Sequence, residues 1–277
     1  MEKNKKVIGI IGYGNMGKAI AERIKPAFNT AIFEKDVFKV KNASGVLVAS
    51  CLSDLTKHAN VVILAVKPQD FNGVLNGIKD NIDNKLVISI VAGKSTRDIE
   101  KILGKVRVIR AMPNLPAKIG KGMSCLCKGK FAKPSDLKFA KEIFALLGET
   151  LILDENMMDK ATATSGSGPG FLYSLISKKS LKEAKKYAKN EFLPVFATTT
   201  GTLRFTKLQA RKIAEVTTLG SIEFLEKTGL SAEDLVKQVA SRGGTTEAGL
   251  KKLKGNVKFL PKAVAAAFKR AKELSGR

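Results

Sequence analysis

The feature that most constrains the fold is a glycine-rich turn between a strand and a helix near the start of the chain. Residues 6–12 (KVIGIIG) form an apolar run, typical of a strand buried on both faces of a parallel sheet. Residues 15–24 (NMGKAIAERI) follow the turn with the spacing of a helix. We therefore expect the chain to open with a strand–turn–helix unit, the beginning of an α/β fold.

Strand-like runs continue through the first half of the chain, separated by connections of helix length. They cover residues 30–36, 46–49, 61–66, 85–93 and 105–114. This alternation predicts a parallel sheet with helices on both faces and right-handed crossovers. From about residue 156 the spacing is helical. We expect an α/β domain over residues 1–155 and an all-helical domain over residues 156–277.

The turn itself has the spacing GxGxxG, in the strand-to-helix position where this motif binds dinucleotides. Gly12 permits a tight turn, Gly14 lets a pyrophosphate approach the backbone, and Gly17 lets the helix pack closely on the sheet. The N–H groups and the dipole of the helix then attract the phosphates. Glycines that serve only the turn are the alternative. We expect a Rossmann-type dinucleotide-binding domain with cofactor contacts from Gly12, Tyr13, Gly14, Asn15, Met16 and Gly17.

The second strand ends in residues that bear on the choice of cofactor. Glu34 lies about 20 residues beyond the turn, where a carboxylate bonds the ribose hydroxyls of NAD and repels the 2′-phosphate of NADP. Lys35 and Lys39 are close enough in sequence to neutralise that phosphate instead. Glu34 as a solvated strand end is the alternative. Glu34 alone favours NAD, but the cofactor stays open as NADP or NAD, with contacts expected from Glu34 and Lys35.

Three later strands end at the same expected edge of the sheet, where ligands collect in open α/β folds. Pro68 forces the chain out of its strand, and Lys67 faces either a phosphate or water. We expect these strand ends to meet at one crevice. The cofactor contacts predicted there are Ala65, Val66, Lys67, Pro68, Ala92, Gly93 and Asn114.

The helical half contains two glycine-rich stretches, each just before a helix-like run. They are residues 165–170 (SGSGPG) and 241–246 (SRGGTT). Backbone N–H groups in such turns bind anions, and a substrate carboxylate suits them. An ordinary helix N-cap is an equally good interpretation of either stretch alone. Beside a dinucleotide site, the two stretches suggest substrate capture.

The composition limits the partners and the location. Lys and Arg number 49 against 25 Asp and Glu, a net charge of +24, but the cations are spread along the chain without interleaved aromatic residues. This distribution favours anionic small molecules over nucleic acid. No apolar run approaches the roughly 20 residues that span a membrane. Three Cys and one His support neither a disulfide framework nor a metal site, and without a recognisable signal peptide we expect a cytoplasmic protein.

The motifs taken together resemble a known family. GYGNMG, AVKPQ, VAG, RAMPNLP, SGSGPG and SRGGTTEAGL occur in the order and at the distances found in pyrroline-5-carboxylate reductase, from about residue 6 to residue 255. The resemblance implies NAD(P)H-dependent reduction of 1-pyrroline-5-carboxylate to L-proline, the last step of proline biosynthesis. It also implies an intertwined homodimer or larger homo-oligomer, in which the helical dimerisation domain completes the active site of the partner.

By the same resemblance, the turn at residues 243–246 holds the substrate. Its backbone N–H groups bind the substrate carboxylate, and its second threonine contacts the ring nitrogen, which makes Thr246 the catalytic residue. The substrate-binding residues are therefore Gly243, Gly244, Thr245 and Thr246. There are two departures from the family: Arg242 replaces a usual proline, and a basic segment around residues 177–194 lengthens the connection between the motifs.

Two other functions remain open at this point. A 3-hydroxy-acid dehydrogenase of similar architecture would need a catalytic lysine one turn into the helix after residues 166–168, where Leu172 and Tyr173 stand. A non-catalytic nucleotide-binding regulatory protein would use the basic surface to bind nucleic acid, and that binding would weaken steeply with salt.

Overall fold

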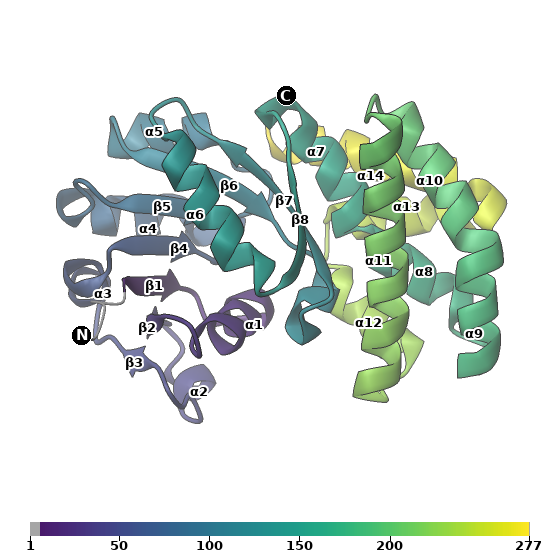
Figure 1. Cartoon of the computed structure of the whole chain (residues 1–277), viewed down its shortest axis with the longest axis horizontal. Helices are drawn as coiled ribbons and strands as arrows, with labels where there is room; N and C mark the ends of the chain where they lie inside the picture. Colours follow the sequence, from purple (N-terminus) through teal and green to yellow (C-terminus); the bar gives the residue numbers. More distant parts are fainter. Residues whose placement is uncertain (1–5, 277) are drawn as a thin grey trace. The chain divides into compact units, whose positions relative to one another are not determined.

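The computed structural model describes residues 6–276 and divides them into two compact units (Figure 1). The sheet unit comprises the chain up to Ala111 with Leu126–Leu146 and Ile152–Glu155. The helical unit comprises Met112–Cys125, Leu147–Leu151 and the chain from Asn156. The chain thus passes between the units several times, and the single domain boundary at residue 155 stays a prediction. Residues 1–5 and 277, at the outer ends of the two expected domains, lie outside the described residues.

Eight strands form one sheet in the order β3-β2-β1-β4-β5-β6-β7-β8. The pairs among the first six strands are parallel, with Ile10 of β1 opposite both Ile32 of β2 and Ile63 of β4. Strand order therefore reverses between β1 and β4, which is the switch point where open α/β sheets bind ligands. The predicted parallel α/β sheet is confirmed. The strands are β1 (Val7–Ile11), β2 (Asn29–Phe33), β3 (Leu47–Val48), β4 (Val61–Leu64), β5 (Leu86–Ser89), β6 (Arg107–Met112), β7 (Gly122–Lys128) and β8 (Gly148–Ile152).

The last two strands are missing from the sequence-based prediction. β7 is buried over six of its seven residues, but its sequence GMSCLCK is rich in small and sulfur-containing side chains rather than branched apolar ones. β8 is one of the two edge strands, and its sequence GETLI is short and half exposed. Neither segment has the apolar run that marks the first six strands.

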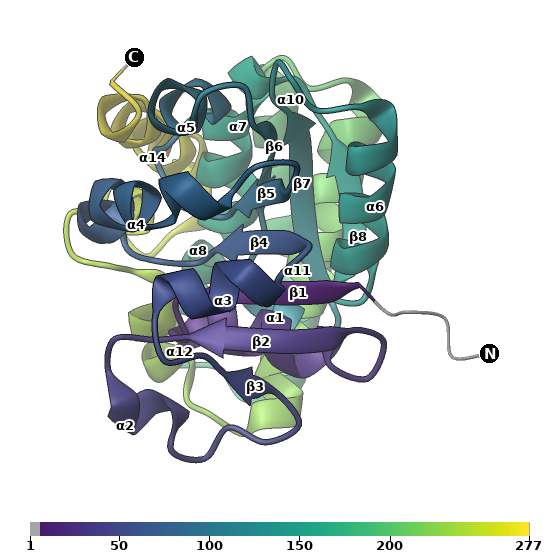
Figure 2. The same cartoon turned by 90° about the vertical axis from the view of Figure 1, so that its left-hand side faces the viewer.

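Helices cover both faces of the sheet unit (Figure 2). Leu55 of α3, Leu75 of α4 and Ile99 of α5 pack with Val62 and Val87 in one apolar cluster, and α6 lies on the opposite side. The helices of this unit are α1 (Asn15–Ile24), α2 (Val37–Val40), α3 (Leu52–His58), α4 (Phe71–Ile78), α5 (Thr96–Leu103) and α6 (Pro134–Ala145). Short 3₁₀ turns are η1 (Pro68–Asp70), η2 (Lys79–Asn81), η3 (Leu115–Ile119) and η4 (Glu155–Met157).

The helical unit packs around a core that includes Phe171, Phe192 and Phe196. Gly229 ends α11 in a left-handed conformation, and the Ser231 side chain caps α12, as these residue types favour at helix ends. Among residues 6–276, no helix has the length and apolar character needed to cross a membrane. The helices are α7 (Met158–Ala161), α8 (Gly168–Ile176), α9 (Leu181–Tyr187), α10 (Leu193–Thr202), α11 (Lys207–Thr228), α12 (Ala232–Val239), α13 (Thr245–Leu253) and α14 (Leu260–Leu274), with π-helical turns η5 (Thr162–Gly166) and η6 (Ala188–Phe192) and a 3₁₀ turn η7 (Val257–Phe259).

Candidate functional site

The glycine turn lies at the switch point, between the end of β1 and the start of α1. Gly12 has φ +99°, and a Cβ there would lie 2.6 Å from the carbonyl oxygen of Ala65. A Cβ on Gly17 would lie only 2.0 Å from the carbonyl oxygen of Gly12. A Cβ on Gly14, in contrast, would meet no atom of the described residues within 4 Å. The turn is therefore tight on its protein side and open at Gly14, the face where a pyrophosphate approaches.

A cavity of about 670 Å³ opens in front of this turn within the sheet unit. It lies at the carboxyl ends of β1, β2 and β4, as the strand order requires of a ligand site. The predicted cofactor residues that line it are Gly12, Gly14, Glu34, Lys35, Ala65, Val66 and Lys67. Side chains not predicted from the sequence also line it, among them Phe33, Gln69, Asp70 and Val74.

The Glu34 carboxylate binds the backbone of the glycine turn. Its Oε2 accepts a 2.7 Å hydrogen bond from the Tyr13 N–H, and its Oε1 accepts from the Asp36 N–H at 3.2 Å. Lys39 Nζ lies 3.6 Å from Glu34 Oε1, and the Glu34 side chain is only 7% exposed. Glu34 therefore lines the cavity with its carboxylate already bonded on two sides.

Three lysines bring positive charge to the same cavity, namely Lys35, Lys39 and Lys67. The Lys35 ammonium lies 2.7 Å from Asp70 Oδ1, and this hydrogen bond and charge raise the pKa of Lys35. Lys67, which precedes η1, is exposed. The cavity thus combines an open turn, a carboxylate and lysines, which suits a phosphate-bearing ligand.

The other predicted cofactor residues lie outside this cavity. Tyr13 is buried, and its hydroxyl donates to Glu22; burial and then the Glu22 charge raise the pKa of Tyr13. Asn114 is in the helical unit, where its amide accepts from Met123 N–H at 2.8 Å and donates to the Ser165 carbonyl at 3.1 Å. Asn15, Met16 and Gly17 form the first turn of α1, Pro68 begins η1, and Ala92 and Gly93 follow β5.

In the helical unit, the predicted substrate turn precedes α13. Gly243 has φ +69°, its N–H donates to Glu247 Oε2 at 2.8 Å, and its carbonyl accepts from Arg270 Nε at 2.7 Å. The Gly244 N–H bonds to the Ser241 carbonyl. Thr245 and Thr246 are the first two residues of α13, so their N–H groups belong to the helix start that attracts anions. Arg242 is exposed.

The two threonine hydroxyls meet at Ser167, a residue to which the sequence analysis gives no role. Thr246 Oγ1 donates to Ser167 Oγ at 3.1 Å, and Thr245 Oγ1 also lies 3.1 Å from it. Thr246 is 4% exposed, and Ser167 is fully buried. The signal in the sequence was a hydroxyl residue between two glycines of SGSGPG, but only the fold brings it to residues 245 and 246.

A second cavity, of about 440 Å³, lies beside this turn. Its walls belong to the turn and to α13 and α14, and its charges are mostly positive. The charged residues that line it are Glu247, Lys251, Lys252, Lys269, Arg270 and Glu273. A carboxylate-bearing ligand near the turn would therefore meet a basic surface.

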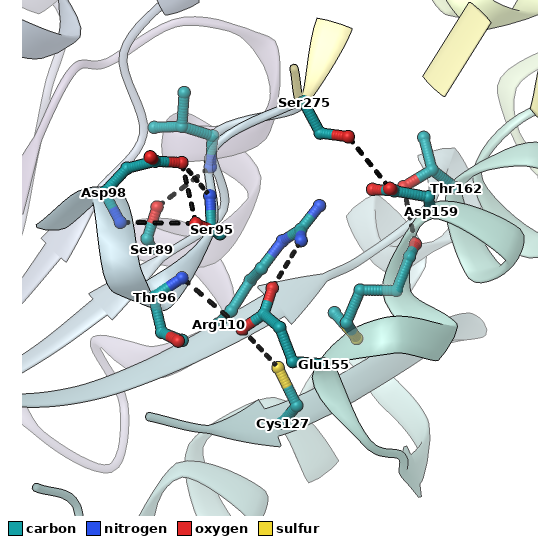
Figure 3. Close-up of polar contacts among 12 residues, drawn as sticks. Ser89, Ser95, Thr96, Asp98, Arg110, Cys127, Glu155, Asp159, Thr162 and Ser275 are labelled. Carbon is teal, nitrogen blue, oxygen red and sulfur yellow. Dashed lines mark hydrogen bonds and ion pairs between the residues drawn. The ribbon is translucent and has the colours of Figure 1, made fainter. Parts of the chain in front are cut away.

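The sheet unit also holds a buried ion pair that the sequence does not reveal (Figure 3). Arg110 of β6 is 1% exposed and lies 2.7 Å from Glu155 Oε1. Glu155 Oε2 accepts from the Thr96 N–H and the Cys127 thiol. Burial raises the pKa of Glu155, but the Arg110 charge and the hydrogen bonds outweigh it, so the net pKa is lowered. Burial raises the pKa of Cys127, which keeps that thiol protonated.

Comparison with known proteins identifies relatives over nearly the whole chain. Family models described as NADP oxidoreductase, coenzyme F420-dependent, and as pyrroline-5-carboxylate reductase dimerisation match residues 7–93 and 192–274. Pyrroline-5-carboxylate reductase of Arabidopsis thaliana is 33% identical over 97% of this chain and 95% of its own, and that of Methanosarcina acetivorans is 34% identical over 99% of both. The solved structure of the Coxiella burnetii reductase is 32% identical, with a TM-score of 0.66 over 98% of this chain and 99% of that one. The Plasmodium falciparum pyrroline carboxylate reductase, solved with NADP bound, is 27% identical, with a TM-score of 0.64 over 98% of both chains.

Proposed function

This chain belongs to the pyrroline-5-carboxylate reductase family, and we infer that it reduces 1-pyrroline-5-carboxylate to L-proline with NADPH or NADH as hydride donor. It is an oxidoreductase of proline biosynthesis. Besides the relatives, the observation that carries this function is the cavity at the switch point, which opens on Gly14 of a GxGxxG turn. A hydroxyl-lined turn at the start of α13 supplies a site for the substrate.

The shape and charge of the first cavity fit the dinucleotide. Gly14 leaves room for the pyrophosphate at the start of α1, while Lys35 and Lys39 lie at the end of β2 where the adenosine ribose is held. Ala65, Val66 and Lys67 would hold the part of the cofactor that passes the end of β4. When bound, the cofactor supplies the hydride.

The reaction needs little acid–base catalysis by the protein. Reduction adds a hydride to the imine carbon and leaves the electron pair of the C=N π bond on nitrogen, so a protonated ring nitrogen yields a neutral amine directly. The N–H groups at the start of α13 bind the substrate carboxylate, and the basic second cavity favours its approach. Thr246 forms the hydrogen bond to the ring nitrogen and thereby orients the imine carbon.

The match of residues 192–274 to the reductase dimerisation model supports a homo-oligomer. We propose a homodimer or a larger assembly in which the helical domain of one subunit completes the active site of its partner. We further propose that residues 1–155 bind the cofactor and that residues 156–277 bind substrate and partner. A cytoplasmic location agrees with the free thiols of Cys51, Cys125 and Cys127.

The test is a reductase assay on the purified full-length chain. Oxidation of NADPH and of NADH is followed separately with 1-pyrroline-5-carboxylate as acceptor, and L-proline is quantified. We expect substrate-dependent oxidation of at least one cofactor, with one proline formed per cofactor oxidised. A 3-hydroxy acid with the oxidised cofactors serves as the control substrate. Turnover of that acid without formation of proline would overturn the proposal.

A further inference from the structure

We propose that Ser167 is a positioning residue that fixes the Thr246 hydroxyl as a hydrogen-bond acceptor, so that the site selects the protonated, iminium form of the pyrroline ring. The inference rests on the proposed function but goes beyond it, because it assigns a role to Ser167 and a protonation state to the bound substrate. It follows from how the hydroxyl protons of the helical unit must be arranged.

The Ser167 proton is used locally. The carbonyl oxygen of Thr162 accepts from both the Ser167 N–H at 3.0 Å and the Ser167 hydroxyl at 3.2 Å. These contacts arise because η5 is a π-helical turn, in which a residue bonds to the carbonyl oxygen of the residue five positions before it. Ser167 is five residues after Thr162. A carbonyl oxygen can only accept, so the single hydroxyl proton of Ser167 points toward Thr162.

Ser167 then faces the threonines with its oxygen lone pairs. Thr246 Oγ1 donates its proton to Ser167 Oγ at 3.1 Å, and Thr245 Oγ1 lies at the same distance. The Thr246 methyl packs beside Gly170, where an added Cβ would come within 2.5 Å of Thr246 Cγ2. This packing fixes the rotamer that turns Oγ1 toward Ser167. Thr246 is thereby left with lone pairs alone for a ligand.

An acceptor at this position distinguishes two forms of the substrate. A protonated iminium nitrogen presents an N–H and needs an acceptor, whereas a neutral imine nitrogen presents a lone pair and needs a donor. The iminium carbon is the more electrophilic of the two. Hydride addition to it gives the neutral secondary amine, whose N–H still donates to Thr246. No proton has to pass through Ser167.

Two charged side chains on the helices packed against this pair bond to Gly243, and not to Ser167 or Thr246. η5 and α8 contain no Asp, Glu, Lys or Arg, and the Tyr173 hydroxyl of α8 donates to the Ser221 carbonyl. On α13 and α14, Glu247 and Arg270 bond to the two sides of Gly243. The remaining charged residues on the helices packed against this pair are Asp159 and Lys160 of α7, Glu215, Glu223, Glu226, Lys207, Arg211, Lys212 and Lys227 of α11, Glu233, Asp234 and Lys237 of α12, Lys251 and Lys252 of α13, Lys258 of η7, and Lys262, Lys269, Lys272 and Glu273 of α14.

The test compares Ser167→Ala with Ser165→Ala in the full-length enzyme. Ser165 is the matched control because it is equally buried in the same motif but donates to the Ala161 carbonyl. For S167A we expect kcat to fall about tenfold, the size of one lost hydrogen bond, with an unchanged KM for the dinucleotide. Its alkaline limb of kcat against pH should move to lower pH by about one unit, since the Thr246 hydroxyl is no longer held as an acceptor for the bound iminium. S165A should keep the wild-type profile.

A double-mutant cycle separates this role from general damage. Thr246→Ala should lower kcat/KM by about tenfold, and S167A/T246A should be no worse than T246A alone, because Ser167 acts through Thr246. Ser167→Cys, which keeps the packing with a weak acceptor, should shift the pH limb as S167A does. Additive losses, or a uniform fall in kcat with an unmoved pH limb, would overturn the inference. A wild-type enzyme that fails to reduce pyrroline-5-carboxylate would instead refute the proposed function.

Discussion

Arg270 Nε donates a 2.7 Å hydrogen bond to the carbonyl oxygen of Gly243, and the Glu247 carboxylate accepts a hydrogen bond from the N–H of the same glycine. A charged side chain thus holds each polar group of a glycine whose φ is +69°. Gly243 precedes α13 by two residues, so this arrangement sets where the helix start and its threonines lie. The turn is positioned by residues that need not touch the substrate.

Replacing Arg270 tests that positioning. Arg270→Met should raise the KM for pyrroline-5-carboxylate about tenfold, because a hydrogen bond from a charged donor is worth about 1.5 to 3 kcal/mol. The KM for the dinucleotide should not change. Lys269→Met is the control, since Lys269 lines the same cavity and its substitution removes the same positive charge. Equal effects of the two substitutions would show that charge alone, rather than the bond to Gly243, matters.

Alanine at two glycines of the turn should affect two different properties, namely stability at Gly17 and cofactor affinity at Gly14. Gly17→Ala would place a Cβ 2.0 Å from a backbone oxygen, and we expect a loss of about 2 kcal/mol or more in the free energy of unfolding. Gly14→Ala has open space and an ordinary φ of −72°, so its stability should stay near that of the wild type. Its KM for the dinucleotide should rise about tenfold as the Cβ meets the pyrophosphate. Urea unfolding measures the stability of each variant, and steady-state kinetics measure its KM for the dinucleotide. A G14A enzyme with wild-type cofactor affinity would contradict the pyrophosphate site proposed at Gly14.

We expect Glu34 to govern the balance between the two cofactors. Glu34→Gln keeps an oxygen to accept the Tyr13 N–H but removes the negative charge near the expected 2′-phosphate. The ratio of kcat/KM for NADPH to that for NADH should therefore rise about threefold to tenfold. Glu22→Gln, on α1 and bonded to the Tyr13 hydroxyl, is the control. An unchanged ratio in E34Q would place the 2′-phosphate elsewhere.

The Arg110–Glu155 pair predicts a stability loss in acid. The folded state lowers the pKa of Glu155 below its unfolded value of about 4.3, so the unfolded state binds the proton first. The pair's contribution is thus complete above about pH 4.3 and is lost as the pH falls through the folded pKa. Glu155→Gln should cost about 3 kcal/mol at pH 7 and show a weaker pH dependence in acid. The free energy of unfolding is measured against pH between pH 7 and pH 3 for both proteins. An equal decrease in wild type and in E155Q would contradict this prediction.

Local patterns in the sequence predict the first six strands and the glycine turn because each depends on neighbouring residues. The apolar runs mark strands buried on both faces, and GxGxxG marks a turn whose crowding against Ala65 the structure confirms. The caps at Gly229 and Ser231 are equally local. β7 and β8 lack such a signal, because a buried strand of small residues and a short edge strand both resemble loops.

The contacts that complete the site depend on the fold. Ser167 and Thr246 are 79 residues apart, and Arg110 and Glu155 are 45 apart, so no spacing rule connects them. The threonines follow from the family resemblance, whereas Ser167 lies in SGSGPG, a stretch that the sequence leaves open between substrate capture and an ordinary helix start. That Glu34 faces the ribose stays a prediction: its carboxylate lines the cavity and also accepts from the Tyr13 N–H of the glycine turn, a bond that no sequence pattern indicates.

The most direct test of the central claim is the transfer of label from cofactor to product. NADPH or NADH that carries deuterium at the transferable position of the nicotinamide is incubated with the enzyme and pyrroline-5-carboxylate, and the proline is analysed by mass spectrometry and NMR. We expect L-proline with one deuterium on Cδ, the ring carbon next to nitrogen that does not carry the carboxylate. Proline without deuterium, or cofactor oxidation that yields no proline, would contradict it.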